Sequence, residues 1–127
     1  MGSSAIPDDV RRYIVQCVPS VPYLEAVTLM SADIAASWDA RQIAQRLYLD
    51  DARTAELLEQ LRAAGVAQPD PHGLWHYTPS SLQLADLLAR LVAVYARNLV
   101  EVSTLVHSKS KSKARLFAAA FVWRKDK

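Results

Sequence analysis

Two helical patterns separated by a very short turn constrain this chain most, between Asp39 and Gly65. Asp39 stands where a helix cap is expected, and Gln42 follows at the spacing of a capping box. Asp50 then begins a second helical pattern over residues 52–64, and Gly65 occupies the position after a helix where glycine is favoured. The apolar residues predicted to face inward are Ile43, Ala44, Leu47, Leu58 and Leu61. The stretch therefore predicts two helices packed across a tight turn.

A short hairpin is predicted directly after the second helix. Val66–Ala67 can pair with Leu74–Tyr77, because Pro69-Asp70-Pro71-His72-Gly73 is rich in turn-forming residues. On the N-terminal side, Pro7 begins one predicted helix and Ser20 caps another over residues 21–30. Cys17 is predicted to be a core residue of the first of these helices. The N-terminal helices are expected to support the two central ones.

The longest helical pattern runs from Leu82 to about His107. Its members repeat as an a/d heptad, with one asparagine at an a-type position: Leu84, Leu88, Leu91, Tyr95, Asn98, Val102 and Leu105. A second apolar stripe runs beside the first: Ala85, Val92, Leu99 and Val106. We interpret the heptad as a homodimerisation interface, and the alternative is one wide face packed on the chain's own body. The chain is accordingly predicted to have two parts. Residues 1–81 form a globular domain, and residues 82–127 form a dimerisation helix with a basic C-terminal segment.

The charges of the chain are divided unevenly. Residues 1–106 hold eight basic and twelve acidic side chains, whereas residues 107–127 hold seven basic and one acidic. The net charge of +2 therefore conceals an acidic body and a basic tail. The tail also contains Leu116, Phe117 and Phe121. It is interpreted as folding back onto the body or a dimer partner, contacting nucleic acid, or lying on an anionic membrane or an acidic partner.

Several classes of protein find no support in the sequence. Three histidines and one cysteine do not form a zinc pattern, so no metal and no cofactor are expected. With only three glycines there is no phosphate-binding loop, and no nucleophile and base stand in a recognisable setting, so an enzyme is not expected. No apolar run reaches the ~18 residues of a membrane span. Lone Cys17 and the absence of a secretory signal predict a cytoplasmic protein.

The run RQIAQRLYLDDARTAELLEQLRAAGV resembles the winged helix-turn-helix transcriptional regulators, the broad group with MarR-, ArsR- and PadR-like proteins. The shared features are an alanine inside the first helix, a leucine before the turn, a capping residue and L-x-x-L-x-x-x-G-V. The resemblance covers about a third of the chain and implies a mainly α fold. It implies a winged helix-turn-helix with a short two-stranded wing, a long C-terminal dimerisation helix and a short terminal helix.

The resemblance further implies a transcriptional regulator that binds double-stranded DNA as a dimer. A runner-up is a winged-helix module whose acidic second helix binds a protein partner, and a third reading is an adaptor that acts through the tail. The residues predicted to contact DNA are Arg41, Arg46, Arg53, Thr54, Lys109, Lys111 and Lys113. The alternative role of the three arginines is to pair with Asp39, Asp50 and Asp51. The second helix is net acidic, and residues 66–81 contain no Lys or Arg, which weighs against a phosphate backbone.

Overall fold

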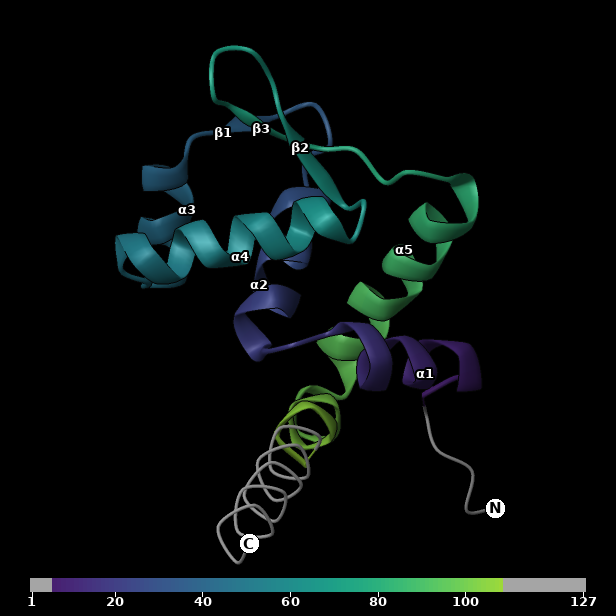
Figure 1. Ribbon diagram of the computed structural model, residues 1–127. Coiled ribbons are helices and arrows are strands. Elements are labelled where there is room, and N and C mark those ends of the chain that lie inside the picture. Colours follow the sequence, from purple (N-terminus) through teal and green to yellow (C-terminus); the bar gives the residue numbers. More distant parts are fainter. Residues whose placement is uncertain (1–5, 109–127) are drawn as a thin grey trace, which may run out of the picture.

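A computed structural model describes residues 6–108, and Figure 1 shows the arrangement of their elements. The described chain is mainly helical, with a small antiparallel sheet. In chain order the elements are α1 (Asp8–Cys17), α2 (Val21–Ser31), β1 (Ser37–Trp38), α3 (Ala40–Leu47), α4 (Asp51–Ala63), β2 (Ala67–Pro69), β3 (Trp75–Tyr77) and α5 (Leu82–Arg97). Residues 99–108 are helical as well. This architecture is compatible with a winged helix.

The sheet has three strands in the order β1-β3-β2, where the sequence predicted two. Trp38 of β1 pairs with Trp75 of β3, and Ala67 of β2 pairs with Tyr77 of β3. The strand β1 was missed because two residues are too few to show the alternating pattern that identifies a strand. Its pairing ties the start of α3 to the hairpin that follows α4.

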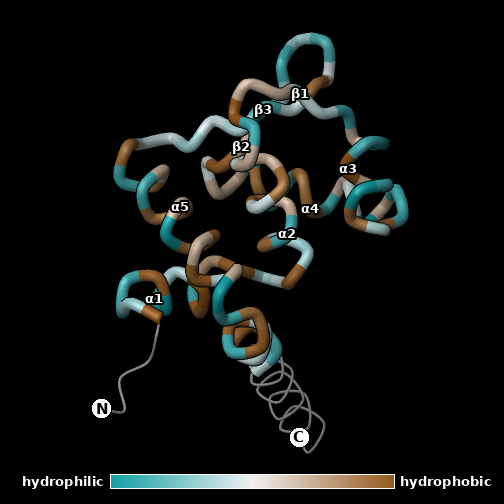
Figure 2. Tube along the Cα trace, turned by 180° about the vertical axis from the view of Figure 1, so that it is seen from behind, coloured by the Kyte–Doolittle hydropathy of each residue, from teal (hydrophilic) through white to brown (hydrophobic). Residues whose placement is uncertain are grey.

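One hydrophobic core extends through all the helices. Hydrophobic segments of α2 and α4 gather at the centre of the molecule, as Figure 2 shows from behind. α5 packs on both α1 and α2, and its Leu88, Leu91 and Tyr95 belong to the same buried cluster as Ile43 of α3. The predicted boundary at residue 81 therefore does not separate two cores. On the surface, Arg90 of α5 binds Asp9 of α1 through two hydrogen bonds of 2.9 and 2.7 Å.

The predicted dimerisation stripe is a core stripe of this chain. Leu88, Leu91, Tyr95 and Val102 are buried against the chain's own helices. Of the other residues assigned to the interface, Leu84 and Leu105 are half-buried and pack on this core. The four buried side chains are thus not available to a second copy, and their assignment to an interface was wrong. The assignment of the half-buried Leu84, Asn98 and Leu105 stays a prediction. The heptad pattern could not distinguish a dimer interface from packing on the chain's own helices, because both require the same apolar residues at the same spacing.

The predicted continuous helix is also interrupted. α5 ends at Arg97, and Asn98 has φ −131° and ψ 51°, outside the helical range. The Asn98 side-chain amide donates to the Val94 carbonyl at 3.1 Å, in competition with the backbone. Asn98 stands at an a-type position of the predicted dimer interface, but in the described structure its side-chain amide bonds within its own chain, at the end of α5.

Cys17 is exposed, although the sequence predicted it in the core. The buried positions of this segment are Val10, Ile14 and Val18, spaced four apart. Cys17 lies on the flank of that stripe. The sequence predicted a wider buried face that included Cys17, because in so short a helix the flanking positions cannot be told from the buried ones.

Candidate interaction surface

Two aspartates cap the starts of α3 and α4 by binding backbone N–H groups. The Asp39 carboxylate accepts a hydrogen bond from the Gln42 backbone N–H at 2.7 Å, and the Gln42 side chain accepts one from the Asp39 N–H at 2.9 Å. The Asp50 carboxylate accepts from the Arg53 N–H at 2.8 Å. Both predicted caps are confirmed, as is Gly65, whose φ is +75°.

Tyr48 forms the corner of the turn between α3 and α4 in a conformation that the sequence did not reveal. Its φ is 57° and its ψ is 46°, the left-handed region that non-glycine residues seldom adopt. Its side chain is 94% exposed. The backbone N–H of Leu49 donates to the Ala44 carbonyl at 3.0 Å and closes the turn. Tyr48 therefore presents an uncovered aromatic ring between α3 and α4.

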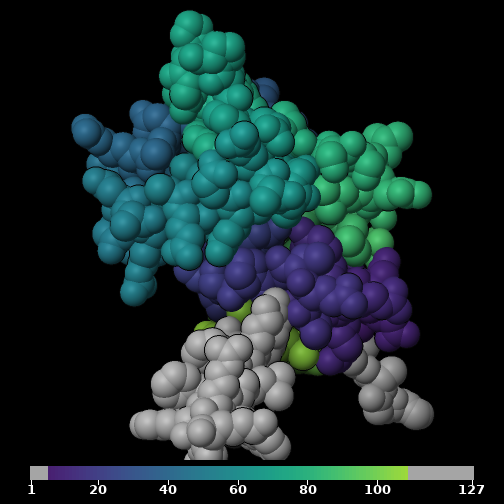
Figure 3. Space-filling view, viewed as in Figure 1, coloured from purple at the N-terminus to yellow at the C-terminus, as the bar shows by residue number. Residues whose placement is uncertain are grey.

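The outer surface of α4 is acidic and rich in alanine. Asp51, Ala52, Ala55, Glu56 and Glu59 are all exposed. In the space-filling view, α4 crosses the front of the molecule between α3 and the N-terminal helices, and the β2–β3 hairpin projects beside it (Figure 3). The only ion pair that α4 makes among the described residues joins Arg62 and Glu59, at 3.3 Å. This surface therefore presents carboxylates that no described cation neutralises, Asp51 and Glu56.

The β2–β3 hairpin is organised by a single carboxylate. Asp70 accepts hydrogen bonds from the backbone N–H groups of His72 at 2.8 Å and Leu74 at 3.0 Å. Its second oxygen lies 2.8 Å from His76 Nε2. The bond from His76, aided by the two backbone donors, lowers the pKa of Asp70 below its usual value. From the sequence Asp70 was only one of several turn-forming residues, whereas in the structure its carboxylate binds two backbone N–H groups of the turn and the His76 ring.

Four of the seven predicted DNA contacts lie in the described residues, and one of these four is buried. Thr54 is 1% exposed and its hydroxyl donates to the Asp50 carbonyl at 2.8 Å, so it cannot reach a ligand. Its assignment as a contact was wrong, because at the fourth position after the cap it turns toward the core. Lys109, Lys111 and Lys113 lie outside the described residues. Arg41, Arg46 and Arg53 remain exposed.

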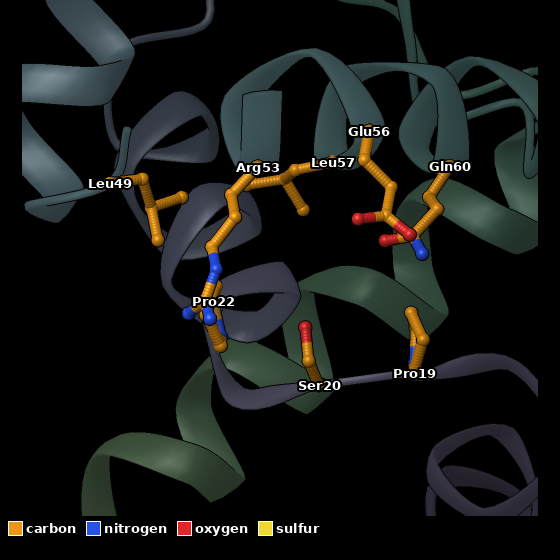
Figure 4. Close-up of a pocket in the computed structure, with 8 residues that line it drawn as sticks. All are labelled: Pro19, Ser20, Pro22, Leu49, Arg53, Glu56, Leu57 and Gln60. Carbon is orange, nitrogen blue, oxygen red and sulfur yellow. The ribbon is translucent and has the colours of Figure 1, made fainter. Parts of the chain in front are cut away.

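These three arginines have different surroundings. The Arg46 guanidinium lies 5.7 Å from the centre of the Trp38 ring, a cation–π distance. Arg53 leaves α4 toward Pro22 (Figure 4). None of the three pairs with Asp39, Asp50 or Asp51 within residues 6–108, because the first two of these carboxylates cap helices. The alternative that the arginines serve as ion-pair partners of these aspartates is therefore not realised in the described structure.

Arg53 lines a cleft between α4 and the segment that joins α1 to α2. The cleft encloses about 390 Å³ and is lined by Pro19, Ser20, Pro22, Leu49, Arg53, Glu56, Leu57 and Gln60. Figure 4 shows Arg53, Glu56 and Gln60 reaching from α4 toward Pro19, Ser20 and Pro22. A second hollow of about 320 Å³ lies beyond Pro22, where Arg46, Tyr48 and Glu25 line it with Val21 and Leu47. Nothing local in the sequence predicts that Pro19 and Pro22 lie beside α4, because the contact joins segments about thirty residues apart.

A bond between α2 and α5 supports the floor of the second hollow. The Tyr95 hydroxyl donates a short hydrogen bond to the half-buried Glu25 carboxylate. Burial, together with the neighbouring Glu25 charge, raises the pKa of Tyr95 to about 12. The phenol therefore keeps its proton and remains a donor to Glu25 throughout the physiological range.

Comparisons of the chain with protein-family models, with curated proteins and with solved structures found no match. Within residues 6–108, no helix has the length and hydropathy that crossing a bilayer requires. In the same part of the chain, no group of three or more His, Cys, Asp or Glu side chains is arranged to hold a metal ion.

Proposed function

We propose that this chain is a winged-helix interaction module that binds a basic surface of a protein partner through the exposed side of α4. The order of the helices and the three-stranded sheet support the winged-helix assignment. The function consists of binding, with no chemical step. The sequence favoured DNA binding over a protein-interaction module, and this proposal places the protein-interaction module first.

The charge of α4 carries this proposal. Asp51 and Glu56 are exposed and form no ion pair with a described residue, while Arg62 is engaged by Glu59. Arg53 is exposed as well and lines the same cleft as Glu56, so two of these three exposed side chains are acidic and one is basic. A helix that enters a DNA groove brings its exposed side chains within a few ångströms of phosphates, and carboxylates there are repelled. The same carboxylates attract lysines and arginines of a protein surface.

The hairpin supports the same conclusion. The 16 residues from 66 to 81, which include the hairpin, contain no Lys or Arg, and Asp70 of the turn is acidic. Strong DNA binders make roughly 6–10 phosphate contacts, whereas the exposed arginines predicted to contact DNA are three, Arg41, Arg46 and Arg53. The exposed Tyr48 ring and the proline-lined cleft add apolar surface next to the charges, as protein interfaces commonly do.

Binding of two labelled probes to the full chain tests the proposal: a random duplex and a lysine-rich amphipathic peptide. At roughly 50 mM salt, we expect the peptide to bind and the duplex not to bind. Replacing Asp51 by asparagine and Glu56 by glutamine should weaken peptide binding several-fold. The matched control Asp33→Asn removes an exposed carboxylate from the loop after α2 and should leave peptide affinity unchanged. Duplex binding with no peptide binding would overturn the proposal.

DNA binding is the second candidate, and one observation favours it. Arg41 and Arg46 are exposed on α3 and form no ion pair with a described residue. Two copies could join these arginines into one patch. This candidate predicts a duplex affinity that falls steeply with salt and that decreases on Arg41→Ala or Arg53→Ala. If duplex binding instead disappears when Lys109, Lys111 and Lys113 become glutamine, the tail is the binding site.

A further inference from the structure

The second hollow, of about 320 Å³ beside Pro22, holds a carboxylate whose charge no described cation neutralises. This carboxylate is Glu25, and we name the space the Glu25 hollow. Glu25 is half-buried, and its side chain has one hydrogen-bond partner among the described residues, the Tyr95 hydroxyl. A hydroxyl is neutral, so it satisfies one oxygen of Glu25 and leaves the negative charge without a counterion. Water screens a half-buried charge less than an exposed one, so Glu25 attracts a cation into the hollow.

Arg46 of α3 lines the same hollow but does not act as this counterion. Its guanidinium lies 5.7 Å from the centre of the Trp38 ring. In residues 6–108 the ion pairs involve other side chains, and none joins Arg46 to Glu25. A cation that neutralises Glu25 therefore comes from outside the described residues.

The walls of the Glu25 hollow are apolar and end in an aromatic ring. Val21, Pro22 and Leu47 are half-buried, and the Tyr48 side chain is 94% exposed at the corner of the turn between α3 and α4. Long cationic side chains lay an apolar stem along such walls and keep the charged end at the polar group. An aromatic face also attracts a cation. The hollow therefore matches a lysine or an arginine side chain.

The hydrogen bond from Tyr95 distinguishes between these two side chains. Tyr95 donates to one oxygen of Glu25, so the other oxygen remains free to accept. A guanidinium gains most from a carboxylate when it binds both oxygens side by side, whereas an ammonium binds as a compact point charge. The Glu25 hollow is therefore better suited to lysine than to arginine.

We propose that the Glu25 hollow binds one lysine side chain of the protein partner, with its ammonium group on the free Glu25 oxygen and its stem against Leu47 and Tyr48. Charge complementarity carries this choice of occupant, because the hollow presents one unneutralised carboxylate between apolar walls. Pro22 lines both this hollow and the cleft along α4, so one partner surface reaches both. The inference rests on the proposed function, since the lysine belongs to the same basic surface that meets α4.

Fluorescence anisotropy of the labelled lysine-rich peptide, titrated with the full chain, tests the Glu25 hollow. Glu25→Gln keeps an acceptor for the Tyr95 hydroxyl and should weaken binding about tenfold, less than the loss for a fully buried charge pair. The control Asp33→Asn removes an exposed carboxylate from the loop after α2 and should bind like wild type. Should Glu25→Gln fail to unfold at the wild-type temperature, Tyr48→Ala repeats the test with a several-fold loss, because the exposed Tyr48 ring lies outside the core.

A second peptide, with arginine in place of every lysine, tests the choice of lysine. The ratio of the affinity for the lysine peptide to that for the arginine peptide should fall several-fold in Glu25→Gln. The ratio should also fall in Tyr95→Phe, because both Glu25 oxygens are then free to bind a guanidinium side by side. A ratio that neither variant changes would refute the assignment of lysine.

The same titrations separate this proposal from the proposed function. If Glu25→Gln and Tyr48→Ala bind like wild type while Asp51→Asn with Glu56→Gln binds weakly, the Glu25 hollow is refuted and the α4 surface stands. If Glu25→Gln alone weakens binding, the α4 surface is refuted and the hollow stands. A wild type that binds neither peptide overturns both.

Two other occupants of the Glu25 hollow would give different results, and either would overturn the proposal. Equal losses for Arg46→Gln and Glu25→Gln would indicate an occupant that carries both charges. Replacing Lys109, Lys111 and Lys113 by glutamine tests the chain's own basic segment. If that change strengthens peptide binding to the wild type but not to Glu25→Gln, the chain's own lysines occupy the hollow.

Discussion

Replacing Leu88 by alanine tests whether the central stripe of α5 belongs to the core of its own chain. Leu88 is fully buried, whereas Leu82 on the same helix is 90% exposed, so Leu82→Ala makes the same chemical change outside the core. Leu88→Ala removes three buried carbons, worth about 0.8 kcal/mol each, or about 2.4 kcal/mol together. The cavity that remains brings the expected loss in unfolding free energy to about 3–4 kcal/mol.

Urea unfolding followed by circular dichroism measures this loss, at a concentration where the wild type is monomeric. With an m-value of about 1–1.5 kcal/mol per molar urea, the midpoint for Leu88→Ala should fall by about 2–4 M. Leu82→Ala should stay within about 0.5 kcal/mol of wild type.

Equal losses for the two variants would refute the burial assigned to α5. A loss under about 1 kcal/mol for Leu88→Ala, together with loss of association, would restore the heptad as a dimer seam. Because total stability of such a domain is about 5–15 kcal/mol, the expected difference is well above measurement error.

Three further changes test individual features. Tyr48→Gly should raise the unfolding free energy by about 1 kcal/mol, because glycine removes the left-handed strain, and Tyr48→Ala should give no such gain in the same urea assay. Tyr95→Phe should lower it by about 1–2 kcal/mol, since Glu25 loses a hydrogen bond in a half-buried site; an unchanged urea midpoint would contradict this bond. Asp70→Asn should lower the unfolding free energy at pH values above the usual aspartate pKa of 3.8. The difference in unfolding free energy from wild type should shrink as the pH falls through the lower pKa of folded Asp70. A difference that does not depend on pH would contradict a role for the charge.

Local chemistry made the two central helices predictable. Asp39, Gln42, Asp50 and Gly65 act through hydrogen bonds and backbone angles that involve only residues up to four positions away. Their roles could therefore be read from spacing alone. The hairpin was predictable for the same reason, since a short turn joins its strands.

The position of the site residues was less predictable. Thr54 and Arg53 are neighbours in sequence, but one is buried and the other lines a cleft with Pro22. A helical pattern gives the angle between two side chains about the helix axis, but it does not tell which side of the helix faces the core. That direction depends on how α4 packs against α2, and this contact joins residues about thirty positions apart.

The sequence by itself determined where helices begin and end around the central turn, and that two apolar stripes run along residues 82–107. Only the tertiary structure decided which stripe is buried, that Asn98 ends α5, and that Trp38 adds a strand to the hairpin. The physical reason is the range of the interactions. Caps and turns are settled by neighbours along the chain, whereas an apolar stripe gains the same free energy against any apolar surface that covers it.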